Sequence, residues 1–280
     1  MIRLVETIRE VRAHVAASRK RAHVVGFVPT MGAFHQGHLS LMHKAKKETD
    51  TVIVSIFVNP LQFAAGEDYD RYPRQMAKDL RMAESEGADV LFSPSVAEMY
   101  PKGFATYIDE NDLPAKLCGQ FRPDHFRGVM SVVGKLFNIV KPDIAYFGQK
   151  DYQQYLIIKR MATDLNLDVD VRVHPTVREE DGLAMSSRNV YLGPKQRKDA
   201  TCLYRALQRA EELIGSGESG AVRVAGEMKR VIHRVKGARI DYIAVVNSDT
   251  LEPVKEIKGK TLIAAAVRIG KARLIDNILV

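Results

Sequence analysis

Short apolar runs alternate with helical patterns through the first 176 residues, and this alternation limits the folds open to the chain. The first pattern in the chain is a helical spacing of apolar residues, which predicts a helix near residues 3–18. The runs that indicate strands are "HVVGFV", "TVIVSIFV", "ADVLFSP", "DIAYFG" and "DVDVRV". Strands this apolar are buried on both faces, and a helix between successive strands favours parallel pairing. We therefore predict an α/β domain over residues 1–176, a Rossmann-like, doubly wound parallel sheet covered by helices on both sides.

The pattern changes after residue 176. A polar loop, "VREEDGLAMSSRNVYLG", precedes a helix predicted over residues 194–214, and a Gly/Ser break, "GSGESG", separates it from a second helix. Three apolar runs then follow, "RIDYIAVVN", "TLIAAAVRIG" and "ARLIDNI", with turn residues between them. This arrangement is typical of a small antiparallel sheet. We predict a smaller C-terminal α+β domain over residues 177–280.

Composition places the chain among soluble globular proteins. Apolar residues make up 46% and charged residues 27% of its 280 residues, and no apolar run approaches the roughly 18 residues that span a bilayer. Only two cysteines occur, Cys118 and Cys202, without the short spacing of a metal site. We expect a cytoplasmic protein with no disulfide framework and no membrane partner.

The net charge of +8 is concentrated in the last third of the sequence. A basic surface suits nucleic acid, an anionic membrane or a phosphate-bearing small molecule, and net charge alone does not separate these ligands. Aromatic residues are only 7%, tryptophan is absent, and no aromatic residues are interleaved with the basic ones. This composition favours a small phosphorylated ligand, and we expect no nucleic-acid partner.

Unusual polar clusters follow three of the predicted strands: "PTMGAFHQGH", "NPLQF" and "FGQKDYQQ". A fourth cluster, "AMSSRN", lies near the predicted domain junction. In an open parallel sheet, ligands bind beyond the carboxyl ends of the strands. We therefore expect the first three clusters to face one crevice. The four clusters share amides and side chains that donate hydrogen bonds to phosphate, and this combination favours a nucleotide site. Each cluster alone is also compatible with an ordinary turn, linker or helix cap.

His35 and His38 lie three residues apart at the start of a predicted helix. Unpaired N–H groups and the helix dipole favour an anion there, and two imidazoles add donors, so phosphate is the natural ligand. In a plainer interpretation, Gly32 and Gly37 make the turn and the histidines are half-buried surface groups. Zinc is less favoured because the His-Glu-x-x-His spacing is missing, and we predict no metal site. No Gly-Lys-Ser/Thr loop and no Gly-x-Gly-x-x-Gly motif follows the first strand, which argues against kinase-like or NAD-dependent chemistry.

Five segments, in this order, closely resemble the pantoate–β-alanine ligase (pantothenate synthetase) family: "PTMGAFHQGH", "SIFVNPLQF", "RPDHFRGV", "KLFNIVKPDIAYFGQKDYQQ" and "MSSRN". The resemblance covers nearly the whole chain. The first and last segments also resemble the HIGH and KMSKS signatures of the wider nucleotidylyltransferase and class I aminoacyl-tRNA synthetase superfamily. One departure is Asp124 in "RPDHFRGV", where we expect a small residue, most often glycine.

The resemblance implies an ATP-dependent ligase that joins (R)-pantoate to β-alanine through a pantoyl-adenylate intermediate, giving pantothenate, AMP and diphosphate. It also implies a Mg²⁺ requirement, a homodimer, a cytoplasmic location and a C-terminal domain that closes over ATP. The catalytic residues it implies are His38, His35, Lys150, Ser186, Ser187 and Arg188. The ATP site would comprise Met31, Gly32, Ala33, Phe34, His35, Gln36, Gly37, His38, Gly148, Gln149, Lys150, Asp151, Val177, Met185, Ser186, Ser187 and Arg188. Gln62 and Gln154 would hold pantoate, with Gln62 also near β-alanine and Asn59 supporting the pocket.

Two functions of other classes remain open from the residues alone. A nucleotidyltransferase would use the same histidines but retain the adenylyl group in its product. An RNA-binding module would use the basic C-terminal third without turnover. Pantoate-dependent chemistry on ATP separates the ligase from both.

Overall fold

The computed structural model describes all 280 residues and contains two compact units. The first comprises Met1–Pro114, Arg122–Gln149 and Gln154–Pro175, and the second comprises Ala115–Phe121, Lys150–Gln153 and Thr176–Val280. The assignment of residues 1–176 and 177–280 to a binding domain and a lid domain stays a prediction. None of the helices has the length and apolar character needed to cross a membrane.

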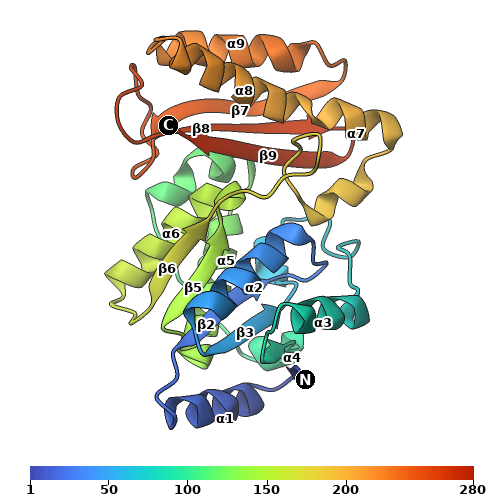
Figure 1. Cartoon of the computed structure of the whole chain (residues 1–280), viewed down its shortest axis with the longest axis vertical. Coiled ribbons are helices and arrows are strands. Elements are labelled where there is room, and N and C mark those ends of the chain that lie inside the picture. The colour runs from blue at the N-terminus through green and yellow to red at the C-terminus, as the bar shows by residue number, and fades with distance from the viewer. The chain divides into compact units, whose positions relative to one another are not determined.

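The first unit is built on a six-stranded, all-parallel sheet (Figure 1). Its strands are β1 (Arg3–Val5), β2 (Val25–Thr30), β3 (Thr51–Ile56), β4 (Val90–Phe92), β5 (Ile144–Gly148) and β6 (Asp170–His174). Their order in the sheet is β1-β4-β3-β2-β5-β6. The chain proceeds outward from β2 in one direction and then crosses to β5, so β2 and β5 are neighbours where the winding reverses. The predicted doubly wound sheet is confirmed, and its ligand crevice is expected at the ends of β2 and β5.

Helices cover both faces of this sheet. They are α1 (Ile8–Arg19), α2 (Gln36–Glu48), α3 (Met76–Ser85), α4 (Val96–Met99), α5 (His125–Val140) and α6 (Tyr152–Asp164). On one face, Val28 and Val54 of the sheet pack in a single buried cluster with Met42 of α2. On the other face, the ring of Phe27 meets Phe137 of α5 edge to face, with centroids 6.4 Å apart. Successive strand residues point to opposite faces, which explains why these strands are apolar throughout.

The N-terminal helix begins later than the sequence pattern predicted. Residues Arg3–Val5 form β1, which pairs with β4, and the helix starts only at Ile8. Thr7 ends the extended segment because its side chain accepts a hydrogen bond from the Glu10 backbone N–H (3.3 Å), while the Glu10 carboxylate accepts one from the Thr7 N–H (3.1 Å). This capping box fixes the first turn, a local signal that the apolar spacing of residues 3–18 conceals.

The second unit has a three-stranded antiparallel sheet, as predicted. Its strands are β7 (Ala238–Asn247), β8 (Thr261–Ile269) and β9 (Ala272–Leu279), in that order. Three helices accompany it: α7 (Pro194–Ala200), α8 (Cys202–Gly215) and α9 (Ala221–His233). The single helix predicted over residues 194–214 is wrong, because the chain breaks at Thr201 into α7 and α8. Leu203, Leu207 and Val224 of these helices pack with Ile263 and Val267 of β8 in one core.

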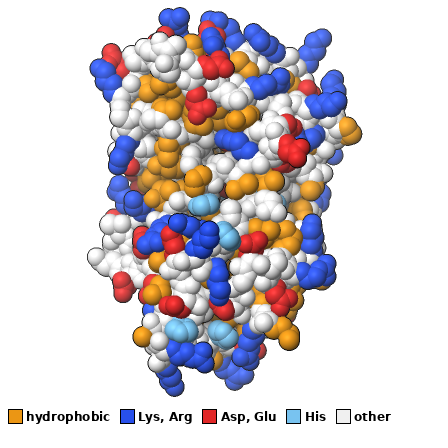
Figure 2. Space-filling model, in the orientation of Figure 1, with side chains coloured by type: hydrophobic (Ala, Val, Ile, Leu, Met, Phe, Trp, Pro, Cys, Tyr) orange, Lys and Arg blue, Asp and Glu red, His pale blue; other side chains and the backbone are white.

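Lys and Arg side chains lie over much of the face drawn in Figure 2. Lys and Arg side chains there are interspersed with Asp, Glu and hydrophobic side chains. Several of the arginines are paired, as Arg197 is with Glu179 and Asp181 at 2.6 Å each.

Asp124, the departure noted in the sequence, lies just before α5 with a φ of +61°. A side chain costs about 1–2 kcal/mol in this left-handed region, although aspartate tolerates it better than most residues, and glycine avoids the cost. We expect Asp124→Gly to raise the free energy of unfolding by about 0.5 kcal/mol, since glycine's entropy loss offsets part of the gain. Asp124→Ala should lower it by about 1 kcal/mol in the same urea titration. The opposite order of the two variants would contradict this account.

Candidate active site

The loop between β2 and α2 is fixed at its start by hydrogen bonds and a glycine. The Thr30 hydroxyl donates to the Ser55 carbonyl (2.6 Å) and accepts from the Gly32 N–H (3.0 Å). Gly32 has a φ of +81°, and a Cβ there would lie 2.9 Å from Ile56 Cγ2. Only glycine fits this turn without displacing a neighbour. The predicted ATP-site segment thus begins directly at the carboxyl end of β2.

Asp79 of α3, which was not predicted as a site residue from the sequence, holds the next part of the same loop. Its side chain is buried, with 1% exposure, and its two oxygens accept the backbone N–H groups of Ala33 (2.8 Å) and Phe34 (2.9 Å). Gln75 donates a third hydrogen bond at 3.3 Å. A signal was present in the sequence, because Asp79 shares the apolar helix face of Met76 and Ala83. A carboxylate on an apolar helix face needs buried donors, and here the loop provides them.

We expect Asp79→Asn to lower the free energy of unfolding by about 2 kcal/mol, because an amide cannot accept at both positions. The amide hydrogens of Ala33 and Phe34 should also exchange faster. Urea titration and hydrogen exchange measure the two effects. Glu84→Gln, an exposed change on the same helix, is the control and should stay within about 0.5 kcal/mol of the parent. Unchanged exchange at Ala33 and Phe34 would show that Asp79 does not hold the loop.

His35 and His38 cap the N-terminus of α2 reciprocally. His35 is the N-cap residue, and its Nδ1 accepts from the Gly37 N–H at 3.1 Å. His38 Nδ1 accepts from the His35 N–H at 3.4 Å, and the ring centroids lie 4.1 Å apart. Since each Nδ1 is an acceptor, a neutral ring carries its proton on Nε2. The pair therefore places two protonated Nε2 atoms at a helix end that already favours anions.

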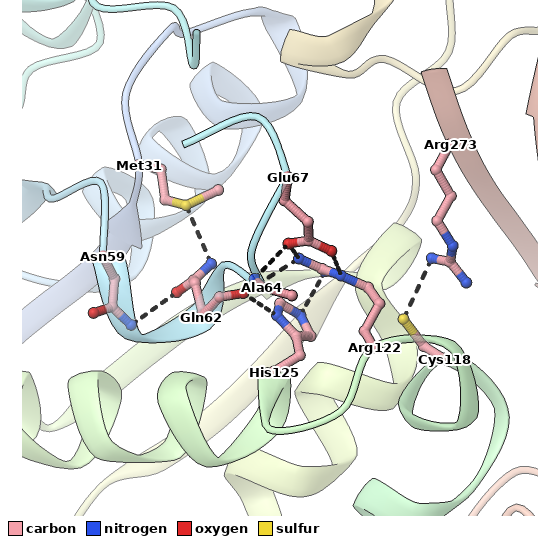
Figure 3. Close-up of polar contacts among 9 residues, drawn as sticks. All are labelled: Met31, Asn59, Gln62, Ala64, Glu67, Cys118, Arg122, His125 and Arg273. Carbon is pink, nitrogen blue, oxygen red and sulfur yellow. Dashed lines mark hydrogen bonds and ion pairs between the residues drawn. The ribbon is translucent and has the colours of Figure 1, made fainter. Parts of the chain in front are cut away.

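Asn59 and Gln62 follow β3 on a 3₁₀ turn, η1 (Pro60–Gln62), and form a network with Met31 (Figure 3). The Asn59 amide nitrogen donates to Gln62 Oε1 (3.1 Å) and to the Gly128 carbonyl (3.0 Å), and its oxygen accepts from the Tyr100 hydroxyl (2.7 Å). Gln62 Nε2 lies 3.2 Å from Met31 Sδ. Burial raises the pKa of Tyr100, so its hydroxyl remains a donor. The structure thus brings Met31, Asn59 and Gln62 together beyond the ends of β2 and β3.

Gly148 ends β5, the other strand beside β2. A Cβ built on Gly148 meets no atom within 4 Å, so the chain itself does not require glycine there. Open space beside this backbone is what close approach of a ligand would use. Gln149 begins a short 3₁₀ turn, Gln149–Asp151, and Gln154 lies in the first turn of α6. Within the first unit, the predicted residues therefore occur at the ends of β2, β3 and β5, as the sequence indicated.

The remaining predicted residues belong to the second unit, where two groups are fixed separately. The backbone carbonyl of Lys150 accepts from Asn277 Nδ2 of β9 (3.0 Å), and the Lys150 ammonium lies 3.5 Å from the Asp151 carboxylate. The Met185 N–H donates to the Val177 carbonyl (3.0 Å). Ser186 then caps the 3₁₀ turn Ser187–Tyr191 by accepting the Arg188 N–H at 3.3 Å. These contacts bring Val177 beside the Met185–Ser186–Ser187–Arg188 segment.

Arg178 anchors that segment and was not predicted from sequence. Its guanidinium pairs with both oxygens of the buried Asp276 of β9 (2.6 and 3.1 Å) and donates to the Gly182 carbonyl (3.1 Å). A planar guanidinium suits this two-point contact better than an ammonium does. Arginine and aspartate separated by almost a hundred residues give no local pattern, so only the folded chain reveals the pair.

Comparison with known proteins assigns the chain to a family. The family model described as pantoate–β-alanine ligase matches residues 3–279. This chain belongs to the pantoate–β-alanine ligase family. Pantothenate synthetases from Acetivibrio thermocellus and Pelotomaculum thermopropionicum are similar to it. The first is 52% identical over 279 residues, covering 100% of this chain and 99% of the relative. The second is 55% identical over 271 residues, covering 97% of this chain and 96% of the relative.

Solved structures of pantoate–β-alanine ligases agree with this assignment. The crystal structure of pantothenate synthetase from Thermus thermophilus matches with a TM-score of 0.95 and 47% identity, covering 99% of each chain. The pantoate–β-alanine ligase of Francisella tularensis, crystallised with β-γ ATP and β-alanine, matches with a TM-score of 0.82 and 35% identity, covering 100% of this chain and 98% of that one. The chain is accordingly an enzyme with pantoate–β-alanine ligase activity, which forms pantothenate.

Proposed function

We propose that the chain activates pantoate with ATP and then transfers it to β-alanine. A pantoate carboxylate oxygen attacks the α-phosphorus of ATP, an O–P bond forms, and the bond to the leaving diphosphate breaks. The β-alanine amine then attacks the acyl carbon of pantoyl adenylate. The acyl C–O bond breaks, AMP leaves with that oxygen, and the amine loses a proton to give the amide of pantothenate.

One observation carries this proposal: the reciprocal cap of His35 and His38 at the N-terminus of α2, directly after β2. A carboxylate approaching a polyanion is repelled, so catalysis depends on donors placed where charge develops. Two Nε2–H groups at the positive end of a helix suit phosphate oxygens whose charge increases as diphosphate leaves. We assign His35 and His38 this role, with His38 as the proton donor.

The other residues follow from their family positions. Gln62 and Gln154 hold pantoate, with Asn59 supporting the pocket. In the second unit, Lys150 and the Ser186–Ser187–Arg188 segment stabilise the departing diphosphate, since an ammonium, hydroxyls and a guanidinium all donate to phosphate oxygens. Residues 177–280 act as a lid that keeps water from the acyl adenylate until the amine arrives.

Mg²⁺ belongs to the proposal as the ion that ATP carries. The chain contains no group of three or more His, Cys, Asp or Glu side chains that could hold a metal ion. Mg²⁺ usually binds through substrate phosphates and keeps several waters, so this donor set fits an ion held mainly by the nucleotide. Its chemistry would be to neutralise phosphate charge. Asp151, beside Lys150, is the one carboxylate among the predicted ATP-site residues and would contact the waters of this ion.

We also propose that the enzyme is a cytoplasmic homodimer. The support is the family resemblance together with the two cysteines, which are both free and buried. Sedimentation equilibrium should give twice the chain mass of 31.3 kDa. A single species at the chain mass would reject the dimer without affecting the proposed chemistry.

An isotope experiment tests the adenylate pathway. Pantoate labelled with ¹⁸O in its carboxylate should yield AMP that carries one ¹⁸O atom, because the attacking oxygen stays on phosphorus when the acyl C–O bond breaks. Label in diphosphate or in inorganic phosphate, with none in AMP, would mean attack at another phosphorus and would reject the proposed step.

A further inference from the structure

The segment "RPDHFRGV" has no role in the reaction proposed above, yet two of its side chains converge on the backbone of Gln62 (Figure 3). Arg122 Nη2 lies 3.3 Å from the Gln62 carbonyl oxygen, and His125 Nδ1 lies 2.8 Å from the same atom. Arg122 also forms a two-point ion pair with Glu67, with Nε–Oε1 at 2.8 Å and Nη2–Oε2 at 2.6 Å. Arg122 Nη1 and His125 Nε2 lie 2.9 Å apart.

These contacts determine where the proton of His125 resides. A carbonyl oxygen only accepts, so Nδ1 must donate to Gln62. A guanidinium only donates, so Nε2 must accept from Arg122. His125 is therefore neutral and protonated on Nδ1, with both ring nitrogens engaged. His125 is 8% exposed, and its imidazole has no spare basic nitrogen for the β-alanine amine, which makes it unsuitable as a general base.

The ion pair is well placed to hold a loop. The Arg122 and Glu67 side chains are 13% and 26% exposed, whereas Arg19 and Asp143, another ion pair of the same unit, are 41% and 35% exposed. Burial alone would raise the pKa of Glu67, but the hydrogen bonds and charge of Arg122 outweigh it and hold the pKa below its ordinary value. Glu67 also accepts the Ala64 N–H at 3.3 Å, which closes the segment between Gln62 and Glu67.

Gln62 is thus held at both ends. Arg122 and His125 hold its backbone carbonyl, while Asn59 and Met31 contact its side-chain amide. We propose that Arg122, His125 and Glu67 form a latch that positions the Gln62 amide for pantoate without touching the substrate. This inference rests on the pantoate-binding role proposed for Gln62. The three residues are positioning residues, because they act only through Gln62.

Steady-state kinetics of the full-length enzyme tests the latch. His125→Leu removes both hydrogen bonds at similar volume, and we expect the KM for pantoate to rise roughly tenfold, the size of effect expected for loss of a hydrogen bond to a charged network. The KM for ATP should stay within about twofold, since the capped histidine segment is held by other contacts. His125→Asn, whose amide can still donate to the Gln62 carbonyl, should restore most of the pantoate affinity.

A double-mutant cycle distinguishes positioning from a general loss of stability. Gln62→Ala should itself raise the pantoate KM, and His125→Leu added to it should raise the KM by less than about twofold, because the latch has nothing left to position. Arg19→Ala, which breaks the comparison pair, should leave the pantoate KM unchanged. Glu67→Gln keeps the shape of the side chain that pairs with Arg122 but removes its charge, and Glu67 is less buried than His125. It should give about a threefold rise in pantoate KM, which keeps the test available if His125→Leu does not fold.

The outcomes separate this inference from the site assignment. If Gln62→Ala raises the pantoate KM but His125→Leu and Glu67→Gln do not, the latch is rejected and the role of Gln62 stands. If Gln62→Ala leaves the pantoate KM unchanged, the proposed binding role fails and the latch fails with it. Full additivity in the double mutant would also reject the latch, since it would show that His125 acts independently of Gln62.

Discussion

His38→Ala is expected to lower the turnover of pantothenate formation by about 10²–10³-fold, the usual effect of removing one preorganised donor from developing charge. The reason lies at the N-terminus of α2, where His38 Nδ1 is taken by the His35 N–H and the proton of the neutral ring resides on Nε2. Initial rates at saturating ATP, pantoate and β-alanine measure the loss.

The same substitution should affect folding little, because the hydrogen bond that His38 Nδ1 accepts is long, at 3.4 Å, and His35 still accepts the Gly37 N–H. Thermal unfolding should therefore shift by only a few degrees. The matched control is His43→Ala on the same helix. His43 is 59% exposed and pairs only with Glu86, at 3.5 Å, so its loss should leave turnover unchanged. Near-normal turnover in His38→Ala would contradict the role given to this histidine.

Gly128→Ala is expected to have the largest effect on stability, lowering the free energy of unfolding by about 3 kcal/mol. A Cβ on Gly128 of α5 would lie 2.2 Å from the Leu61 carbonyl oxygen and 2.7 Å from the Gln62 backbone nitrogen. Both are backbone atoms and cannot rotate away, so the turn that carries Gln62 must move. The Gly128 carbonyl also accepts from Asn59, and that hydrogen bond should weaken. Urea unfolding measures the first effect, and the pantoate KM, which should rise, measures the second.

Gly226→Ala on α9 is the control for this change. A Cβ there meets no atom within 4 Å, so only helix propensity acts. The free energy of unfolding should increase by up to about 1 kcal/mol, with the pantoate KM unchanged. If Gly128→Ala stabilises the protein as Gly226→Ala does, the close contact between α5 and the Pro60–Gln62 turn does not determine the position of Gln62.

The sequence revealed the parts of this fold that depend on local patterns. Apolar runs predict buried parallel strands because such strands need no polar face, and the polar clusters after them fall at the ends of β2, β3 and β5 for the same topological reason. The helix predicted over residues 3–18 was wrong at its start, since Leu4 and Val5 suit a strand as well as a helix turn. The pairing of Arg3–Val5 with β4 and the cap at Thr7 together decide that this segment is a strand.

What the sequence did not reveal depends on contacts between distant residues. Asp79 lies 46 and 45 residues along the chain from Ala33 and Phe34, whose backbone N–H groups donate to it. Arg122 lies 55 residues from Glu67. No spacing rule predicts such pairs. The expectation of a small residue at position 124 has a physical basis in the left-handed backbone of Asp124, which the residue type alone does not indicate.

Pantoate-dependent isotope exchange tests the central claim most directly. The enzyme incubated with ATP, Mg²⁺, pantoate and labelled diphosphate, in the absence of β-alanine, should move label into ATP, because formation of pantoyl adenylate is reversible. Omitting pantoate should abolish the exchange, and adding β-alanine should release AMP and pantothenate. Pantothenate formation with no pantoate-dependent exchange, even at high concentrations of labelled diphosphate, would contradict a freely reversible adenylate step and the site built around it.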